Sequence, residues 1–577
     1  MAKTAKSESE TTIGALSSEV LERVLGFVES SKDRGNASMV CTAWYKAEAW
    51  SRRRVYIGNC YAVSAEILVR RFPKLTSILL KGKPRFSDFN MVPPHWGADL
   101  MPWLVVISEK YSFLEELRLK RMVVTDECLR FIARAFPNFK RLWLHSCEGF
   151  STEGLAAIAS HCRNLTELDV QENEIDDRGG YWLSCFPDNF NSLEILNFPC
   201  LQCEVNFDAL ERLVARCRSL KSLKLNKNIS LEQLQRLLVK APQLIELGTG
   251  SFSEELRQYA ELEIGFNNCR QLRRLSLMGE AASRNLHVLH SVCKNLTFLN
   301  LSYICIGSMD FTNLVVNCHN LQRLWVLDTV KDKGLEAVSA NCKELREIRV
   351  FPDTYGHELS GVTEKGIVAI SRGCPNLCYI LYFCKQMTNA AVISVAQNCP
   401  KFTHFRLCIM DPYQPDYLTE EPMDEAFGAV VKTCKNLRRL SVSGWLTDKT
   451  FEYIGRYAKQ LETLSIAFAG SGDRGMQHLL QGCPKLRKLE IRDSPFGDKA
   501  LLSGLERYES MRSLWMSACH VTLEGCRLLA QKMPRLNVEL IKKDDDEEND
   551  ENDGDKLYVY RTVAGRRKDA PNFVLQL

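Results

Sequence analysis

The chain has 577 residues, with 75 basic and 71 acidic side chains and a formal net charge of +4. This length is too great for one compact globule, but a repeat protein can reach it without a larger core. The sequence contains neither an apolar run of roughly 18 residues, which would cross a bilayer, nor an apolar signal core at its start, so we expect no membrane association and no secretion. The 23 cysteines are then reduced thiols rather than a disulfide framework.

The first part of the chain predicts a disordered end and a small helical domain. Residues 1–12 are polar and predict disorder. Residues 13–54 predict a compact helical segment, in which Ser17 or Ser18 caps the first helix. One face of that helix is apolar and contains Val20, Leu21, Val24, Leu25 and Val28. Residues 32–36 are expected to break it before a second helix that begins near residue 37.

About forty residues are too few for a domain that is stable alone, so this segment must share its apolar face with a partner or with the next domain. Its pattern resembles an F-box, the module that docks the Skp-type adaptor of an SCF ubiquitin ligase. The residues that carry the pattern are Leu16, Leu21, Leu25, Asp33, Val40, Cys41 and Trp44. The resemblance implies that Leu16, Leu21 and Leu25 bind the adaptor.

Residues 55–541 predict leucine-rich repeats, each made of one strand and one helix. Cysteines recur at one repeat position, mostly 24 or 25 residues or about twice that apart, at Cys162, Cys217, Cys269, Cys293, Cys318, Cys342, Cys374, Cys399, Cys434 and Cys483. We expect these thiols to pack as small hydrophobic groups. The expected fold is α/β: the helical F-box, then a curved, nearly closed solenoid with parallel strands on its concave face and helices outside. Residues 542–556 predict an acidic disordered loop, and residues 557–577 a C-terminal cap.

Four successive repeats, at residues 399–408, 434–443, 458–467 and 483–492, place polar residues in one row. Side chains alternate in a strand, so their apolar partners point inward and the residues between them line the concave face. The row is Arg406, Ser441, Ser465 and Glu490. Strands lie about 4.8 Å apart, so Arg406 and Ser465 are roughly 10 Å apart. That spacing suits a small ring-bearing carboxylate; the alternative is a merely solvated polar row.

Three insertions interrupt the repeats, at residues 83–96, 351–360 and 409–418. Insertions at a common repeat position emerge on one surface of a solenoid, often the binding face. They predict a site covered by loops.

Basic residues gather at the starts of strands or just inside the curve. Residues 544–555 hold nine acids in twelve positions, and removing them from the net charge of +4 leaves about +13 on the folded body, which favours an anionic partner. In a nearly closed ring these cations converge and favour a compact polyphosphate; the alternative is a scatter of solvated charges. Nucleic acid would need an extended basic stripe with stacking aromatics, which the sequence lacks. No catalytic motif occurs either, so we expect a binding protein, not an enzyme.

Motifs along the chain closely resemble the transport-inhibitor-response and auxin-signalling F-box family, at residues 54–64, 80–84, 118–126, 382–389, 405–408, 446–449 and 560–565. The resemblance covers residues 14 to 575. It implies an auxin co-receptor and SCF substrate-recognition subunit in the nucleus. Such a protein would bind inositol hexakisphosphate and indole-3-acetic acid, join a Skp-type adaptor and cullin, and recruit Aux/IAA repressors for ubiquitination and degradation through a Gly-Trp-Pro-Pro degron.

The resemblance also implies roles for individual residues. Arg406 would hold the auxin carboxylate beside Ser441, and the rest of the hormone pocket would be Ser465, Leu407, Ile466, Phe86 and Phe89. The degron would contact Phe383, Cys408, Arg439, Val442 and Glu490. The inositol phosphate would be bound by Lys81, Lys120, Arg121, Arg349, Arg439, Arg487 and Arg512.

The sequence departs from the family pattern at several positions. Arg85 stands where the family usually has His and the jasmonate (coronatine-insensitive) receptors have Arg, and His404 replaces an Arg that would contact the inositol phosphate. Thr463 stands for Met, Val442 for Leu, and the loop after Pro352 offers only Tyr355 near the place of an expected Phe. Two alternatives stay open: an SCF adaptor whose pocket takes another carboxylate or whose substrate binding needs no hormone, and a non-ligase repeat scaffold in which residues 13–54 are only a cap.

Overall fold

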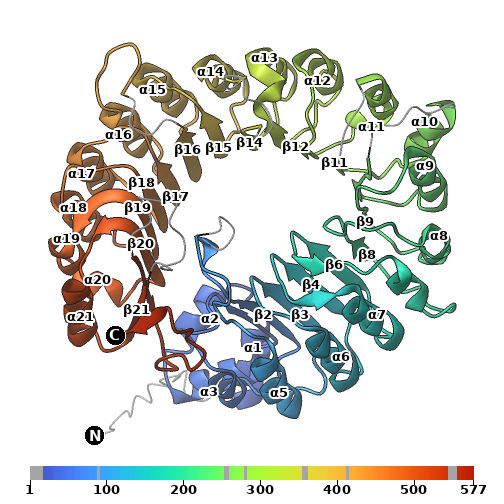
Figure 1. Ribbon diagram of the computed structural model, residues 1–577, viewed down its shortest axis with the longest axis horizontal. Helices are drawn as coiled ribbons and strands as arrows, with labels where there is room; N and C mark the ends of the chain where they lie inside the picture. Colours follow the sequence, from blue (N-terminus) through green and yellow to red (C-terminus); the bar gives the residue numbers. More distant parts are fainter. Residues whose placement is uncertain are drawn as a thin grey trace, which may run out of the picture.

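The computed structural model describes residues 17–86, 91–251, 259–278, 283–353, 361–410, 415–542 and 555–577. The chain winds into an almost closed ring with strands inside and helices outside (Figure 1). Among the described residues, 21 strands form one sheet that follows the ring. This architecture confirms the predicted leucine-rich-repeat solenoid. No helix in the described ranges is long and apolar enough to span a membrane.

The parallel part of the sheet consists of β1 (Arg54–Ile57), β2 (Ser77–Lys81), β3 (Glu116–Lys120), β4 (Arg141–His145), β6 (Glu167–Gln171), β8 (Ile195–Asn197), β9 (Ser222–Lys224), β10 (Glu246–Gly248), β11 (Arg274–Met278), β12 (Phe298–Tyr303), β13 (Arg323–Leu327), β14 (Glu347–Phe351), β15 (Tyr379–Cys384), β16 (His404–Ile409), β17 (Arg439–Val442), β18 (Thr463–Ala467), β19 (Lys488–Gly497) and β20 (Ser513–His520). Three antiparallel strands complete it: β21 (Leu536–Ile541), β22 (Lys556–Arg561) and β23 (Val574–Gln576). A separate pair is β5 (Phe150–Ser151) and β7 (Ile175–Asp176).

The outer layer consists of α4 (Ala65–Arg71), α5 (Met101–Lys110), α6 (Asp126–Ala135), α7 (Thr152–His161), η3 (Tyr181–Cys185), α8 (Phe207–Arg216), α9 (Leu231–Lys240), α10 (Tyr259–Asn268), η4 (Ser283–Leu289), α11 (His290–Cys293), α12 (Ser308–Val315), η5 (Asp328–Val330), α13 (Lys331–Asn341), α14 (Glu364–Gly373), α15 (Asn389–Asn398), α16 (Asp424–Thr433), α17 (Asp448–Tyr457), α18 (Arg474–Gly482), α19 (Asp498–Leu502), α20 (Leu505–Tyr508) and α21 (Leu523–Lys532).

The repeat cysteines form part of the core between the two layers. All ten anchor cysteines are buried. Several donate a hydrogen bond from Sγ to the carbonyl of the equivalent cysteine one repeat earlier: Cys342 to Cys318 at 3.3 Å and Cys374 to Cys342 at 3.4 Å. Burial raises the pKa of Cys342 to about 12. Buried in this way, the ten cysteines pack as small hydrophobic groups, as expected.

A second device joins neighbouring repeats, and the sequence reasoning missed it. An aspartate in the first turn of one helix accepts hydrogen bonds from the N-cap residue of the next. Asp332 accepts from the backbone N and the Oγ1 of Thr363 at 2.8 and 2.6 Å, and Asp424 does the same for Thr447. Each threonine in turn accepts a bond from its own helix, so the carboxylate supports the N-cap of the following helix.

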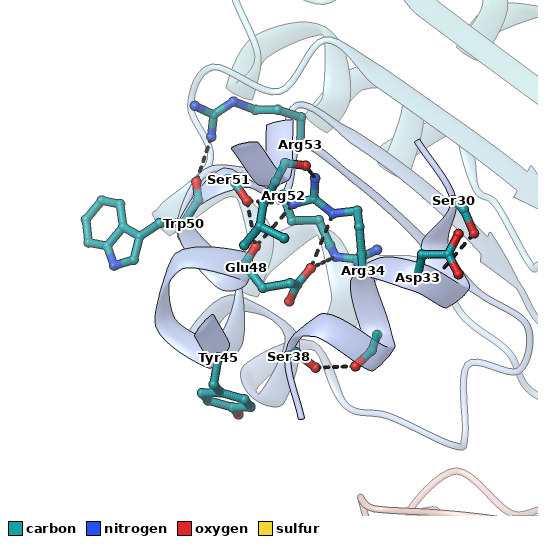
Figure 2. A network of polar contacts seen from close by, with 12 residues as sticks. Ser30, Asp33, Arg34, Ser38, Tyr45, Glu48, Trp50, Ser51, Arg52 and Arg53 are labelled. Carbon is teal, nitrogen blue, oxygen red and sulfur yellow. Dashed lines mark hydrogen bonds and ion pairs between the residues drawn. The ribbon is translucent and has the colours of Figure 1, made fainter. Parts of the chain in front are cut away.

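The N-terminal domain has three helices: α1 (Ser18–Gly26), α2 (Ser31–Ala37) and α3 (Thr42–Ser51). Ser17 caps α1. The predicted break at residues 32–36 is wrong, because those residues form α2. Its Arg34 is buried, donates to the carbonyl oxygen of Leu25 and to Ser51 Oγ, and lies 3.5 Å from a carboxylate oxygen of Glu48 (Figure 2).

Glu48 also fastens this domain to the solenoid. It is 1% exposed and forms ion pairs with Arg52 at 2.5 Å and with Arg71 of α4 at 3.0 Å. A carboxylate so deeply buried is tolerated because three guanidinium groups surround it. The domain therefore has a fixed position against the first repeat.

The two ends of the solenoid meet at a seam, defined here as the contacts between residues 56–103 and residues 558–569 (Figure 1). The backbone N of Val563 donates to the carbonyl of Ala62, and Thr562 Oγ1 donates to that of Tyr61, at 2.9 and 3.1 Å. Arg567 donates to the carbonyl of Trp96 at 2.7 Å and is ion-paired with Glu539 at 3.1 Å, with both side chains buried. The C-terminal cap thus closes the ring on the first repeats.

Candidate functional site

A cavity of about 250 Å³, the basic pocket, lies beside the seam. One wall comes from the start of the solenoid and the other from its end. Five predicted polyphosphate ligands line it, namely Lys81, Lys120, Arg121, Arg439 and Arg512. The sequence reasoning missed other residues in its lining, notably Tyr56, Lys83, Lys488, Trp515 and Tyr558. Lys488 could have been found from register, because it aligns with Arg439 two strands away.

Two predicted ligands lie elsewhere. Arg349 donates from Nε to Glu347 at 2.7 Å and its guanidinium lies 4.1 Å from the ring centre of Trp325. Arg487 lines a neighbouring groove together with Arg52 and Arg561. Neither lines the basic pocket.

The electrostatics of the basic pocket fit an anion of high charge density. Lys81, Arg439 and Arg512 have no carboxylate partner among the residues that the structure describes. Burial would raise the pKa of Tyr56, but a hydrogen bond with Lys81 and the charges of Lys81, Arg512 and Arg121 outweigh it and lower that pKa. The pKa of Lys488 is also lowered, in this case by burial, which disfavours the charged ammonium group. Converging cations of this kind suit multidentate phosphate recognition.

A second cavity of about 440 Å³, the apolar pocket, adjoins the first. The strand register brings Arg406, Ser441, Ser465 and Glu490 into one row, as predicted. Phe86, Leu407 and Ile466 also line this pocket. Leu407 and Ile466 are buried, so they form its floor. Phe89 falls outside the described residues.

Arg406 is the cation at one end of the row. Its Nε donates to Ser441 Oγ at 3.2 Å, and no carboxylate among the described residues pairs with it. The side chain is half-buried, so its charge is partly removed from water without a counter-ion. A guanidinium in that state favours a bound carboxylate.

Arg85, Phe86 and Glu490 line both pockets and so form their shared wall. Arg85 Nη1 lies 3.5 Å from Glu490 Oε2, and Lys488 also pairs with Glu490. Burial alone would raise the pKa of Glu490, but Lys488, Arg85 and the Ser465 hydroxyl hold it at about 2. Phe86 stacks on Trp515 with ring centres 4.7 Å apart. Trp515 follows Glu490 in the same row.

The remaining predicted degron residues divide between the two pockets. Phe383, Cys408 and Val442 line it, and Arg439 lies in the basic pocket. Phe383 and Cys408 are half-buried, whereas Val442 is 2% and Glu490 3% exposed. Burial raises the pKa of Cys408, so its thiol is protonated.

Two of the three insertions contribute to the apolar pocket. Met91 belongs to the first and Met410 to the third, and both line the cavity. Most of the second, including Tyr355, lies outside the described residues. In the part of the chain that is described, no cluster of three or more His, Cys, Asp or Glu side chains could hold a metal ion.

The N-terminal domain requires a correction. Leu21 and Leu25, predicted to bind an adaptor, are 3% and 1% exposed and form the domain's own core with Ala47. The exposed face of α1 instead carries Val20, Val24 and Phe27, the last 80% exposed. The sequence shows one broad apolar stripe on this helix, which includes both the core residues and the exposed residues, so it could not indicate which of them face a partner. Leu16 falls outside the described residues.

Comparison with known proteins gives matches along the chain. Residues 14–54 match the F-box, residues 73–119 the transport inhibitor response 1 protein domain, and residues 161–184 a leucine-rich repeat. GRR1-like protein 1 of Arabidopsis thaliana is 52% identical over 560 residues, 96% of each chain. A transport inhibitor response 1-like protein of Oryza sativa subsp. japonica is 52% identical over 565 residues, and coronatine-insensitive protein 1 of Arabidopsis thaliana is 30% identical over 579, each again over 96% of both chains.

Proposed function

This chain belongs to the transport inhibitor response 1-like family of F-box proteins, and from that premise we propose that it is an auxin co-receptor. In this proposal it binds auxin together with the degron of Aux/IAA repressors and promotes their ubiquitination and proteasomal degradation, in the nucleus.

The ligase role follows from the family itself. F-box proteins of this kind are substrate-recognition adaptors of SCF ubiquitin ligases and not enzymes. The chain accordingly has a Skp-type adaptor as its partner, through which it joins the ligase complex. The non-ligase scaffold considered from the sequence is set aside by the F-box match.

One observation carries the hormone proposal. Arg406, half-buried and without a carboxylate partner among the described residues, lies at the end of a pocket with apolar walls. An aromatic acid would place its carboxylate on Arg406 and its ring against Phe86, Leu407 and Ile466. The ring would then fill space between receptor and degron, so the ligand raises affinity by completing a contact surface rather than by moving a hinge.

We propose that inositol hexakisphosphate occupies the basic pocket. Lys81, Lys120, Arg121, Arg439 and Arg512 would hold its phosphates, since they come together there from both ends of the solenoid. When bound, the polyphosphate supplies negative charge that relieves the repulsion among these cations.

A different carboxylate hormone is the second candidate. Arg85 in the shared wall favours it, because a second guanidinium at the pocket could recognise an additional polar group of the ligand. Comparing indole-3-acetic acid with a jasmonate-type acid in one assay separates the two candidates.

The first experiment measures binding of a Gly-Trp-Pro-Pro degron peptide to the purified complex with the adaptor, with and without indole-3-acetic acid. We expect binding to rise at least tenfold with the hormone. Equal, weak degron binding with and without indole-3-acetic acid, and no increase with a jasmonate-type acid, would refute the receptor proposal. The ligase role would remain intact.

Adaptor docking is tested separately with a double substitution, Val24→Asp with Phe27→Asp. Two charges on the exposed face should abolish co-purification with a Skp-type adaptor while the solenoid melts normally. The matched variant Leu25→Asp should instead unfold the small domain, because Leu25 is in its core. Retained adaptor binding in the double variant would contradict the assignment.

A further inference from the structure

Tyr56 of β1 is an aromatic side chain that lines the basic pocket where the two ends of the solenoid meet. It is 47% exposed. Lys81 Nζ, from the start of the solenoid, lies 5.0 Å from the centre of its ring, and the guanidinium carbon of Arg512, from the end, lies 5.8 Å from it. The ring is therefore close to two predicted polyphosphate ligands that come from opposite ends of the chain.

Gly58 makes room for this arrangement. A Cβ atom at this position would lie 3.2 Å from Arg512 Nη1 and 3.3 Å from Tyr56 Cε1, closer than side chains normally approach. The glycine thus lets the guanidinium group lie against β1 beside the phenol ring. Tyr56, Gly58 and Arg512 also line the neighbouring groove, so they form part of the wall between that groove and the basic pocket.

The hydroxyl group of Tyr56 has one hydrogen-bond partner among the described residues, the ammonium group of Lys81. Burial would raise the pKa of this phenol, but the bond with Lys81 and the charges of Lys81, Arg512 and Arg121 lower it. An ammonium group can only donate, so the Tyr56 oxygen is the acceptor and its own hydrogen remains for another partner. The nearby cations make that hydrogen a stronger donor, and an anion is the partner that suits it.

We propose that Tyr56 is a ligand of the polyphosphate: its hydroxyl donates a hydrogen bond to the phosphate group that Lys81 and Arg512 hold from the two ends of the solenoid. This inference rests on the proposed polyphosphate site and adds a neutral donor to its cations. A neutral donor strengthens phosphate binding without adding to the repulsion among the cations of the empty pocket.

The substitution Tyr56→Phe removes the hydroxyl and keeps the ring, and the inference fixes the sign of its effect. If the hydroxyl served only as an acceptor for Lys81, its removal would free Lys81 for the ligand, and the affinity would stay the same or rise. Because it donates to the phosphate, its removal should lower the affinity by about tenfold, the scale of one hydrogen bond to a charged group.

The matched control is Tyr303→Phe, which removes the hydroxyl of another exposed tyrosine, 49% exposed and on β12, far along the ring from β1. It should leave the affinity within about twofold of the wild type. Because the ring of Tyr56 is half exposed and stays in place, thermal unfolding of ligand-free Tyr56→Phe should match that of the wild type.

The test uses the full chain in complex with its adaptor, stripped of bound phosphate, and calorimetry with inositol hexakisphosphate at pH 7. Salt separates the hydroxyl from the charges. Between about 0.1 and about 0.5 M salt, the loss of affinity in Arg512→Gln should shrink, because ions screen a contact between charges, whereas the loss in Tyr56→Phe should stay within about twofold of its value.

Two results overturn the inference. One is an unchanged or higher affinity in Tyr56→Phe. The other is a loss in Tyr56→Phe that shrinks with salt in parallel with that of Arg512→Gln, which would mean that the hydroxyl acts only through the cations. If the wild type binds no inositol hexakisphosphate, the proposed polyphosphate site fails and this inference with it; if Arg512→Gln binds more weakly than the wild type and Tyr56→Phe does not, this inference alone fails.

Discussion

The concave face differs between the back of the ring, here strands β4 to β14, and the strands beside the seam. Both regions carry basic side chains in the same strand rows. At the back some of them are paired with acids on neighbouring strands, as Lys224 and Arg274 are with Glu246. Beside the seam, Arg439 and Arg512 have no carboxylate partner among the described residues. Basic residues at equivalent repeat positions therefore do not by themselves mark a binding site; beside the seam, several of them line one cavity.

The comparison also shows where buried charge holds the ring together. The back needs no long-range contact, because each repeat packs on the next. The seam joins residues far apart in the sequence through Arg567, which is paired within the C-terminal part with the buried Glu539 and donates across the seam to the carbonyl of Trp96. The following substitutions test how stability and ligand binding depend on whether a basic side chain is paired with an acid and on whether it lies at the seam or at the back of the ring.

The largest effect is expected for Arg567→Met. It leaves Glu539 buried without its cation, which typically costs about 3–5 kcal/mol. The matched variant at the back is Arg274→Met, whose side chain is 43% exposed and whose loss should cost about 1 kcal/mol or less. Thermal unfolding of both variants measures the difference. Equal melting temperatures would show that the seam contributes no more than the back.

Next in size is Arg406→Ala. It should weaken hormone-promoted degron binding about a hundredfold, because the ligand carboxylate loses its charged partner. Lys224 lies in the same concave row but is paired, so Lys224→Ala should change binding by less than about threefold. Degron-peptide titrations with saturating indole-3-acetic acid measure both. A comparable loss of degron affinity in the two variants would mean that a residue's position in the row determines its contribution to binding, whether or not it is paired with an acid.

Arg512→Gln should reduce the affinity for inositol hexakisphosphate by about tenfold, since one charge-assisted contact is lost. The control, Arg274→Gln, should leave that affinity unchanged. Calorimetry on protein stripped of bound phosphate gives both values. An unchanged affinity in Arg512→Gln would remove this residue from the proposed polyphosphate site.

The smallest effect concerns His404, which lies beside Arg439 on the neighbouring strand. Burial and the charges of Arg439, Arg349 and Arg406 lower its pKa to about 4, so it is neutral at pH 7. His404→Arg should improve inositol hexakisphosphate binding about threefold at pH 7, the scale of one partly exposed charge. The wild type should approach the variant only as the pH falls towards 4, where His404 gains its proton. If the difference in inositol hexakisphosphate affinity between the wild type and His404→Arg stays constant from pH 7 to 4, this role of His404 is contradicted.

How far the sequence predicts the structure depends on the distance over which a contact acts. The row Arg406–Ser441–Ser465–Glu490 was predicted because parallel strands in successive repeats keep register. Helix α2 was missed because Arg34 depends on Glu48, fourteen residues away. Leu21 and Val24 could not be told apart because α1 is apolar over a wide stripe, and only tertiary packing shows which side faces the core.

The same limit applies to charge pairing. The sequence predicted Arg349 and Arg512 as equivalent ligands, but only the structure shows that Arg349 is paired with Glu347 and that Arg512 lines the cavity. The contacts of Arg567 cross almost the whole chain, and no local pattern indicates them.

Closure of the ring restricts how such a protein can change over evolution. An open solenoid can gain or lose a whole repeat at little cost, since each unit contacts only its neighbours. In this chain an added unit would part Ala62 from Val563 and would also divide the basic pocket, whose walls come from both ends. The number of repeats is therefore fixed, and new specificity must arise within repeats, by lengthening loops such as those that carry Phe86 and Met410, or by single replacements such as Arg85 on the shared wall.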